Sequence, residues 1–190
     1  MERPADDLEL VRAFQGGDDA AFEQLVRRYR NAVASFIVAT LGRRADIEDL
    51  SQEVFLRVHQ ALPRFQPGGS FPSWLYRITI NLCRDEIRKK RLRRFLSLDA
   101  MEETDHLMAD SSARTDAAAS HNEQREVILA ALRKIDGKYR TALVLREYED
   151  LSYAQIARIL GITQGAVKSR IFRARDQLRE LLKGYFKERT

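Results

Sequence analysis

Several residue types are scarce in this chain of 190 residues, and each scarcity excludes a class of protein. A single cysteine, Cys83, excludes an internal disulfide framework and is compatible with a reducing compartment. The three histidines, His59, His106 and His121, have no second ligand at helical spacing. The sequence therefore predicts neither a metal site nor a bound cofactor.

Long apolar runs are also missing. The longest, "VASFIVATL" at residues 33–41, is too short to cross a bilayer. The N-terminal "MERPADDLEL" has neither the basic region nor the apolar core of a signal peptide. We expect a protein of the cytoplasm that does not insert into the membrane.

Charge is plentiful but unevenly distributed. Residues 1–95 carry 17 basic and 13 acidic side chains, and residues 124–190 carry 15 and 8, whereas residues 96–123 carry 1 and 7. Two basic bodies joined by an acidic connector are expected. Basic bodies favour a polyanionic partner because binding releases counterions, although solubility alone would equally explain the charge of the first body.

Apolar residues recur at helical spacing in both basic bodies, and strand-like alternation is absent, so the sequence predicts an all-α fold. The periodicity and the large apolar residues disappear over residues 96–123. We expect a flexible linker there, between helical domains at 1–95 and 124–190.

The segment "LSYAQIARILGITQGAVKSRIFRAR", residues 151–175, has the pattern of a helix-turn-helix. Ser152 is a good N-cap, and Gly161 suits the end of the first helix and the turn. Ala157, Gly161 and Val167 occupy the fifth, ninth and fifteenth places of a twenty-residue unit, where a close helix crossing, a turn and an apolar plug are needed. In such a motif the second helix enters the DNA major groove. A plain helical hairpin is the alternative.

The second helix of this motif carries an unusual outer face. Lys168, Ser169, Phe172 and Arg173 lie opposite its apolar stripe, and Gln164 stands at its start. A solvated charged face is the ordinary explanation of such a pattern. An aromatic ring among cations, pointing away from the apolar stripe, instead indicates a contact surface for duplex DNA.

A second candidate surface lies on the helix predicted after residue 70. A helical wheel places an indole, three guanidiniums and an amide on one face: Trp74, Arg77, Asn81, Arg84 and Arg88. Single-stranded nucleic acid needs this mixture, because bases stack on aromatic rings while arginines bind phosphates. A buried tryptophan beside solvated arginines is an equally good interpretation of these residues alone.

The loop before this helix favours the binding interpretation. Gly68, Gly69 and Ser70 form a small-residue segment that allows close approach, and Phe65 and Phe71 flank it. Such a loop suits the capture of an extruded base. An ordinary helix connector is the more common role of a glycine loop.

A third candidate surface lies on the helix predicted at residues 46–61. Asp49, Gln52, Glu53 and Leu56 point away from its apolar stripe. A leucine among acids and glutamine on a basic domain indicates a face that docks on a protein, because these acids would repel DNA.

These motifs together resemble the extracytoplasmic-function (ECF) group of the σ70 family of bacterial RNA polymerase sigma factors. The resemblance rests on "DIEDLSQEVFLRVHQAL" for family region 2.2, "RFQPGGSFPSWLYRITINLCRDEIRKKR" for regions 2.3 and 2.4, and "KYRTALVLREYEDLSYAQIARILGITQGAVKSRIFRARDQL" for region 4. It implies a promoter-recognition subunit rather than an enzyme. Its partners would be core RNA polymerase, through the β′ and β subunits, promoter DNA in duplex and single-stranded form, and an anti-sigma factor.

The resemblance also assigns roles to the three surfaces. The Asp49–Leu56 face would dock on core polymerase, the Trp74 face with the 65–71 loop would open and bind the −10 element, and the Phe172 face would read the −35 element. The alternative is a stand-alone helix-turn-helix regulator, which leaves the first two surfaces unexplained. A nucleic-acid enzyme would need an acid pair, a P-loop or a metal set that this sequence lacks.

Overall fold

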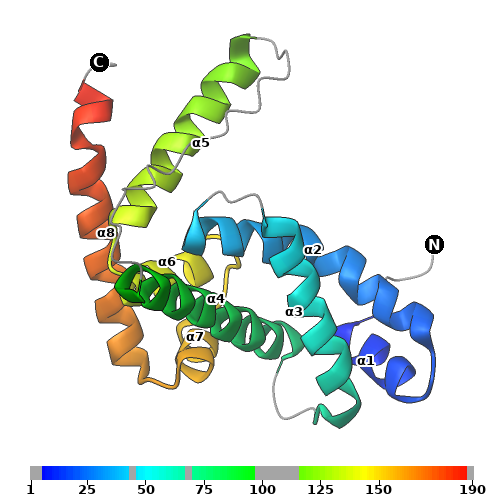
Figure 1. The fold of residues 1–190 in the computed structure, drawn as a ribbon. Coiled ribbons are helices and arrows are strands. Elements are labelled where there is room, and N and C mark those ends of the chain that lie inside the picture. Colours follow the sequence, from blue (N-terminus) through cyan, green and yellow to red (C-terminus); the bar gives the residue numbers. More distant parts are fainter. Residues whose placement is uncertain (1–5, 43–45, 67–69, 97–115, 188–190) are drawn as a thin grey trace.

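The computed structural model describes residues 6–42, 46–66, 70–96 and 116–187, and every regular element in these ranges is helical. The elements, in chain order, are α1 (Asp7–Gln15), α2 (Asp19–Leu41), α3 (Ile47–Ala61), the 3-10 turn η1 (Leu62–Arg64), α4 (Phe71–Leu96), α5 (Asp116–Lys134), α6 (Gly137–Glu147), α7 (Tyr153–Leu160) and α8 (Gln164–Lys187). The predicted all-α fold is confirmed (Figure 1).

Helices α1 to α4 form the first body. Local chemistry sets the helix starts: Asp6 forms a capping box with Glu9, and the Asp18 carboxylate accepts a hydrogen bond from Ala20 N at 3.0 Å. The long helix α2 packs against α1, α3 and α4. Its apolar stripe, which includes Leu25, Val33, Phe36 and Ile37, is fully buried there.

Helices α5 to α8 form the second body, in which α8 packs against α5, α6 and α7. Ser152 and Gln155 form a capping box at the start of α7, and Gly161 ends it with φ +66° in the left-handed region. The buried guanidinium of Arg140 donates from Nη1 to the carbonyl oxygens of Leu132 and Arg133, at 3.3 and 3.0 Å. It thereby satisfies acceptors that the C-terminus of α5 leaves without helical partners.

Gly161→Ala is expected to lower the free energy of unfolding by about 1–2 kcal/mol, because a residue with a Cβ is strained at this positive φ. Gly165→Ala is the matched control. A Cβ at Gly165, in the first turn of α8, would meet nothing closer than Thr163 Oγ1 at 4.0 Å. We expect this change to be neutral or stabilising, since alanine is the better helix former. Urea denaturation of both variants measures the difference, and equal effects would contradict this account of the turn.

The segment expected as a linker, 96–123, is partly helical. Leu96 still belongs to α4, and α5 begins at Asp116, so residues 116–123 extend the second body toward the N-terminus. The reason is helix propensity: three consecutive alanines, 117–119, favour a helix without supplying the large apolar side chains on which the prediction relied. Residues 97–115 lie outside the described part of the chain.

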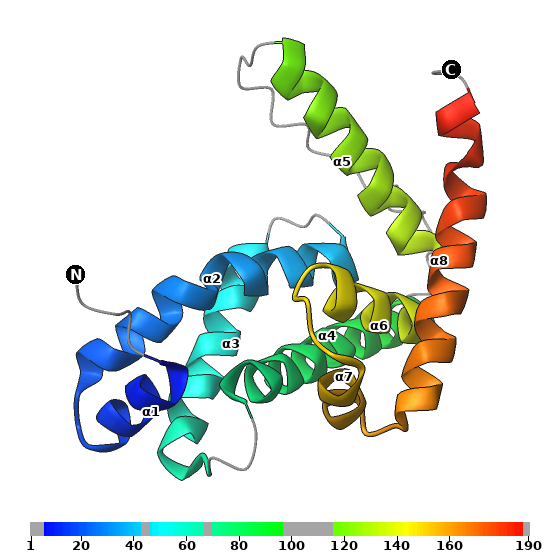
Figure 2. The ribbon, with the colours of Figure 1, turned by 180° about the vertical axis from the view of Figure 1, so that it is seen from behind.

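The two bodies pack against each other. Helix α2 contacts α5 and α6, and α4 contacts α7, so that α7 lies between α4 and α8 (Figures 1 and 2). One buried apolar cluster continues from Phe36 and Tyr76 of the first body to Ile156 and Ile171 of the second. We call this state, with α7 packed on α4, the closed arrangement.

A hydrogen bond joins the two bodies within this contact. The Tyr76 hydroxyl donates to a carboxylate oxygen of Glu149 in the segment between α6 and α7. Burial, and then this bond, raise the pKa of Tyr76, and burial also raises the pKa of the Glu149 carboxyl above its ordinary value. This hydrogen bond therefore ties α4 to the segment that precedes α7.

Candidate nucleic-acid interface

The exposed face of α8 has the geometry expected for a recognition helix. Thr163 Oγ1 accepts a hydrogen bond from Ala166 N at 3.2 Å and thus caps the helix. One side of α8 packs into the second body through Val167, Ile171 and Ala174, which are at most 1% exposed. The Phe172 ring on the opposite side is 71% exposed, as the helical period predicted.

The other residues predicted on this face are also exposed: Gln164, Lys168, Ser169 and Arg173. A residue of α6 holds one of them in place. Arg173 Nη1 donates to the hydroxyl oxygen of Tyr139 at 2.9 Å, and its guanidinium lies 5.8 Å from the centroid of the same ring. This hydrogen bond is the main cause that lowers the pKa of Tyr139.

Sequence reasoning did not find Tyr139 as a neighbour of this face, because Tyr139 and Arg173 are 34 residues apart. The local pattern in "KYR" contains no information about a contact across two helices. The hydroxyl and the ring of Tyr139 together hold the Arg173 guanidinium in place.

The arginine and asparagine row on α4 is present as predicted. Arg77, Asn81, Arg84 and Arg88 are all exposed on this helix. Arg88 Nη1 lies 3.5 Å from Asp85 Oδ1, and such a solvent-exposed ion pair contributes little to stability. Asn81 makes no hydrogen bond through its side chain with any residue in the described ranges, so its amide is open to solvent.

The aromatic part of this surface differs from the prediction. Phe71 is 1% exposed and Phe65 is 8% exposed, and their ring centroids lie 6.0 and 5.0 Å from that of the half-buried Trp74. In this arrangement Phe71 is a core residue and Phe65 nearly one, so neither is placed to hold an extruded base. The rings cluster because α4 begins at Phe71 and η1 brings Phe65 back against its first turn.

Only part of the flanking loop can be placed. Ser70 Oγ lies 2.7 Å from Ser73 Oγ, within hydrogen-bond distance at the start of α4. The other two predicted loop residues, Gly68 and Gly69, lie outside the described residues.

The second body covers one end of the α4 row. Arg77 Nη2 donates to the carbonyl oxygen of Arg158 in α7 at 3.1 Å. In the closed arrangement this guanidinium is therefore occupied by the protein's own backbone. The sequence contained no sign of this contact between residues 81 positions apart.

Three of the four residues of the predicted docking face on α3 are exposed. Asp49 and Gln52 are exposed, and Leu56 is 58% exposed although it is a large apolar residue. Glu53 is half-buried, and its carboxylate accepts a hydrogen bond from Arg57 Nε at 2.7 Å. Arg57 also lies 3.8 Å from Asp85 of α4. Within the described ranges Asp49 is thus the acid of this face without an ion pair, whereas Glu53 takes part in a network within the first body.

Two further features of the described ranges concern metals and membranes. No three side chains of His, Cys, Asp or Glu come together there as ligands for a metal ion. None of the described helices has both the length and the apolar character that a bilayer crossing requires.

Comparison with known families agrees with this geometry. The family model of sigma-70 region 2 matches residues 25–93, and that of sigma-70 region 4 matches residues 125–178. The first range runs from α2 to α4, and the second from α5 to α8. The chain belongs to the sigma-70 family.

Comparison with curated relatives identifies the group within the sigma-70 family. The chain is 33% identical over 188 residues to the RNA polymerase sigma-H factor of Pseudomonas aeruginosa, with 96% of each chain covered. It is 33% identical over 178 residues to the ECF RNA polymerase sigma factor SigW of Bacillus subtilis, which covers 91% of this chain and 95% of SigW. It is an ECF RNA polymerase sigma factor, and the prediction of this function over a stand-alone regulator is confirmed.

Solved structures show the same fold. CnrH, determined in complex with the cytosolic domain of CnrY, has a TM-score of 0.69 at 30% identity and covers 94% of this chain and 97% of CnrH. RpoE of Bartonella quintana, determined with the anti-sigma factor NepR, has a TM-score of 0.68 at 25% identity, with 85% of this chain and 96% of RpoE covered. Both likenesses extend over the two bodies.

Proposed function

We propose that three exposed surfaces divide the work of this sigma factor. The α3 face, with Asp49, Gln52, Glu53 and Leu56, docks on core RNA polymerase. The α4 row binds the −10 element once its strands separate. The outer face of α8 reads the −35 element. The observation that carries this proposal is the Phe172 ring, 71% exposed among cations on a helix whose other side is fully buried.

The α8 face suits duplex DNA on physical grounds. Lys168 and Arg173 supply positive charge, and Ser169 and Gln164 supply hydrogen-bonding groups, all on the side of the helix that the body leaves open. An α-helix fits the major groove, where base edges present distinct donors, acceptors and the thymine methyl group. Phe172 would contact such a methyl group, and Arg173 a guanine edge or a phosphate.

Phe172→Ala is expected to weaken −35 duplex binding by roughly 5- to 100-fold, equivalent to about 1–3 kcal/mol for one base contact, while the melting temperature stays unchanged. Fluorescence anisotropy with a −35 duplex and thermal unfolding of the same sample measure both. Ile171→Ala is the matched control: this neighbour is 1% exposed, and its loss should cost about 2–5 kcal/mol of stability. Normal −35 binding by Phe172→Ala would refute the assignment of α8.

The α4 row is proposed for the −10 element because it combines exposed guanidiniums with an unoccupied amide. Arg84 and Arg88 would bind phosphates, and Asn81 would read the edge of an unpaired base. Trp74 would offer only the exposed part of its ring, since it is half-buried against Phe65 and Phe71. Arg77 can join only when its hydrogen bond to Arg158 is broken. Use of the complete α4 row therefore requires α7 to leave α4.

The α3 face is proposed for polymerase docking because it is acidic and apolar on an otherwise basic body. An exposed leucine beside Asp49 matches a partner with an apolar contact and basic surroundings. Such a face repels DNA, so it separates the polymerase contact from the two DNA contacts.

We further propose that the chain acts in the cytoplasm beside RNA polymerase, without covalent chemistry of its own. An anti-sigma partner is expected as well. RpoE of Bartonella quintana, which shares this fold, was determined with the anti-sigma factor NepR, and CnrH was determined with the cytosolic domain of CnrY. Two measurements test the proposed role as a sigma factor: co-purification of the protein with core RNA polymerase, and promoter binding that depends on the presence of core polymerase.

A further inference from the structure

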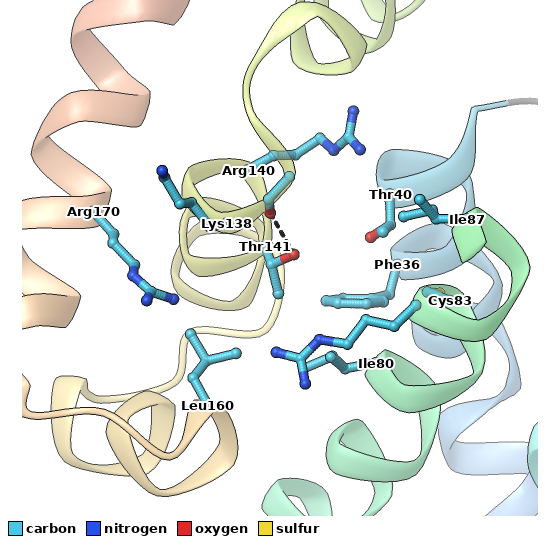
Figure 3. A pocket seen from close by; sticks show the side chains of 12 residues that line it. Phe36, Thr40, Ile80, Cys83, Ile87, Lys138, Arg140, Thr141, Leu160 and Arg170 are labelled. Carbon is cyan, nitrogen blue, oxygen red and sulfur yellow. Dashed lines mark hydrogen bonds between the residues drawn. The ribbon is translucent and has the colours of Figure 1, made fainter. Parts of the chain in front are cut away.

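A cavity of about 200 Å³ lies where the two bodies meet. The Thr40 hydroxyl of α2 points into it, and the Arg170 guanidinium extends toward it from α8 (Figure 3). Lys138 and Arg140 of α6 also line it, with the Lys138 ammonium directed away from its centre. Arg84 of α4 also lines it. Four of its lining residues are cations and none is acidic. Such a cavity is electrostatically suited to an anion.

Two of the buried polar atoms around this cavity have no hydrogen-bond partner among the residues that the structure describes. Thr40 is 5% exposed, and its hydroxyl oxygen makes no hydrogen bond. Arg140 is 8% exposed, and its Nε is likewise unpartnered although Nη1 is fixed by two carbonyl oxygens of α5. Leaving such groups unsatisfied is costly, so both atoms point to a missing hydrogen-bonding partner.

The charges in the cavity are also poorly compensated. Asp136 compensates two of them in part, because its Oδ2 lies 3.6 Å from Lys138 Nζ and its charge acts to raise the pKa of Arg140. Arg84 and Arg170, in contrast, make no ion pair or side-chain hydrogen bond within the described part of the chain. Burial lowers the pKa of Arg140, which indicates that its charged form is under-solvated. Bringing these cations together as the bodies close therefore costs free energy unless an anion enters.

We propose that this cavity binds a small phosphate-type oxyanion, phosphate or pyrophosphate, in the closed arrangement. Guanidiniums match phosphate oxygens with paired N–H groups, and the Thr40 hydroxyl adds a further donor. The volume is below the roughly 300–1,000 Å³ of pockets for drug-sized ligands, so the cavity suits the phosphate group rather than an entire nucleotide. This inference does not depend on the promoter and polymerase assignments above.

The position of the cavity gives the anion a regulatory consequence. Its cations come from α4 of the first body and from α6 and α8 of the second, so the complete set exists only while the bodies are together. A ligand that binds one of two arrangements shifts the population toward it. Bound oxyanion thus stabilises the arrangement in which Arg77 is occupied by α7.

Titration calorimetry with pyrophosphate, at constant ionic strength, tests the site. Arg170→Gln should weaken binding about ten-fold or more, because it removes a charge-assisted hydrogen-bond donor. Arg179→Gln is the matched control, since Arg179 lies on the same helix, outside the cavity, and pairs with Asp176. Loss in Arg170→Gln with parental affinity in Arg179→Gln supports the site. No binding to the parent protein, or equal affinities in both variants, overturns it.

Thr40→Val separates binding from folding. The valine keeps the branched shape and removes an unpartnered buried hydroxyl, so the melting temperature without anion should be unchanged or higher. Pyrophosphate affinity should nevertheless fall. Amide hydrogen exchange measures how much of the protein is in the closed arrangement. Pyrophosphate should slow exchange of the α7 amides in the parent protein and not in Arg170→Gln. Parental affinity in Thr40→Val, or unchanged exchange in α7, contradicts the proposal.

Discussion

Asn81→Ala is expected to reduce promoter opening by roughly 10- to 100-fold while leaving −35 duplex binding unchanged. The amide is exposed on α4, and a good contact to a base edge is worth about 1–3 kcal/mol. This contact forms only after the strands separate, so duplex affinity does not depend on it. Permanganate reactivity of thymines near the start site, measured with core polymerase, reports the opening.

The structure determines the choice of this residue over Trp74. The indole packs against Phe65 and Phe71, so Trp74→Ala would empty part of an aromatic cluster and lower stability as well as binding. Asn31→Ala is the matched control, because Asn31 is an exposed asparagine on α2, away from the α4 row. Permanganate reactivity at the parental level in Asn81→Ala would refute the single-strand surface.

Asp49→Lys is expected to lower the affinity for core RNA polymerase on the order of ten-fold or more, because it reverses a charge at a face that should meet basic residues. Asp49 is preferable to Glu53 for this test. The Glu53 carboxylate already pairs with Arg57, so its reversal would also disturb a network inside the first body. Competition with a labelled sigma factor for core polymerase measures the affinity.

Glu48→Lys is the control for this change. Glu48 is the adjacent exposed acid on α3, and it lies outside the proposed face, so the same charge reversal should have a much smaller effect. Leu56→Ala should weaken docking without any change in charge, since it removes the exposed apolar contact. Equal competition by the parent, Asp49→Lys and Leu56→Ala would remove the docking role from α3.

The amino-acid sequence by itself determined the helical class, the helix-turn-helix and the outward direction of Phe172. These features depend on interactions within a few residues of each other. Ser152 caps the helix that begins at the next residue, and Gly161 adopts the positive φ of the turn. The exposure of Phe172 follows from 3.6 residues per turn, because it lies opposite the buried Val167 and Ile171. Interactions between residues close together in the chain can be recognised from the sequence alone.

Only the tertiary structure decided which of the predicted surface residues are accessible. Phe71 enters the core through its packing with Trp74, Arg77 is occupied by a carbonyl of α7, and Tyr139 orients Arg173. The cationic cavity likewise exists only because α4, α6 and α8 converge. Each of these features depends on where helices distant in sequence come to rest against one another. Helical periodicity specifies the buried side of a helix, but it does not specify which partner covers that side.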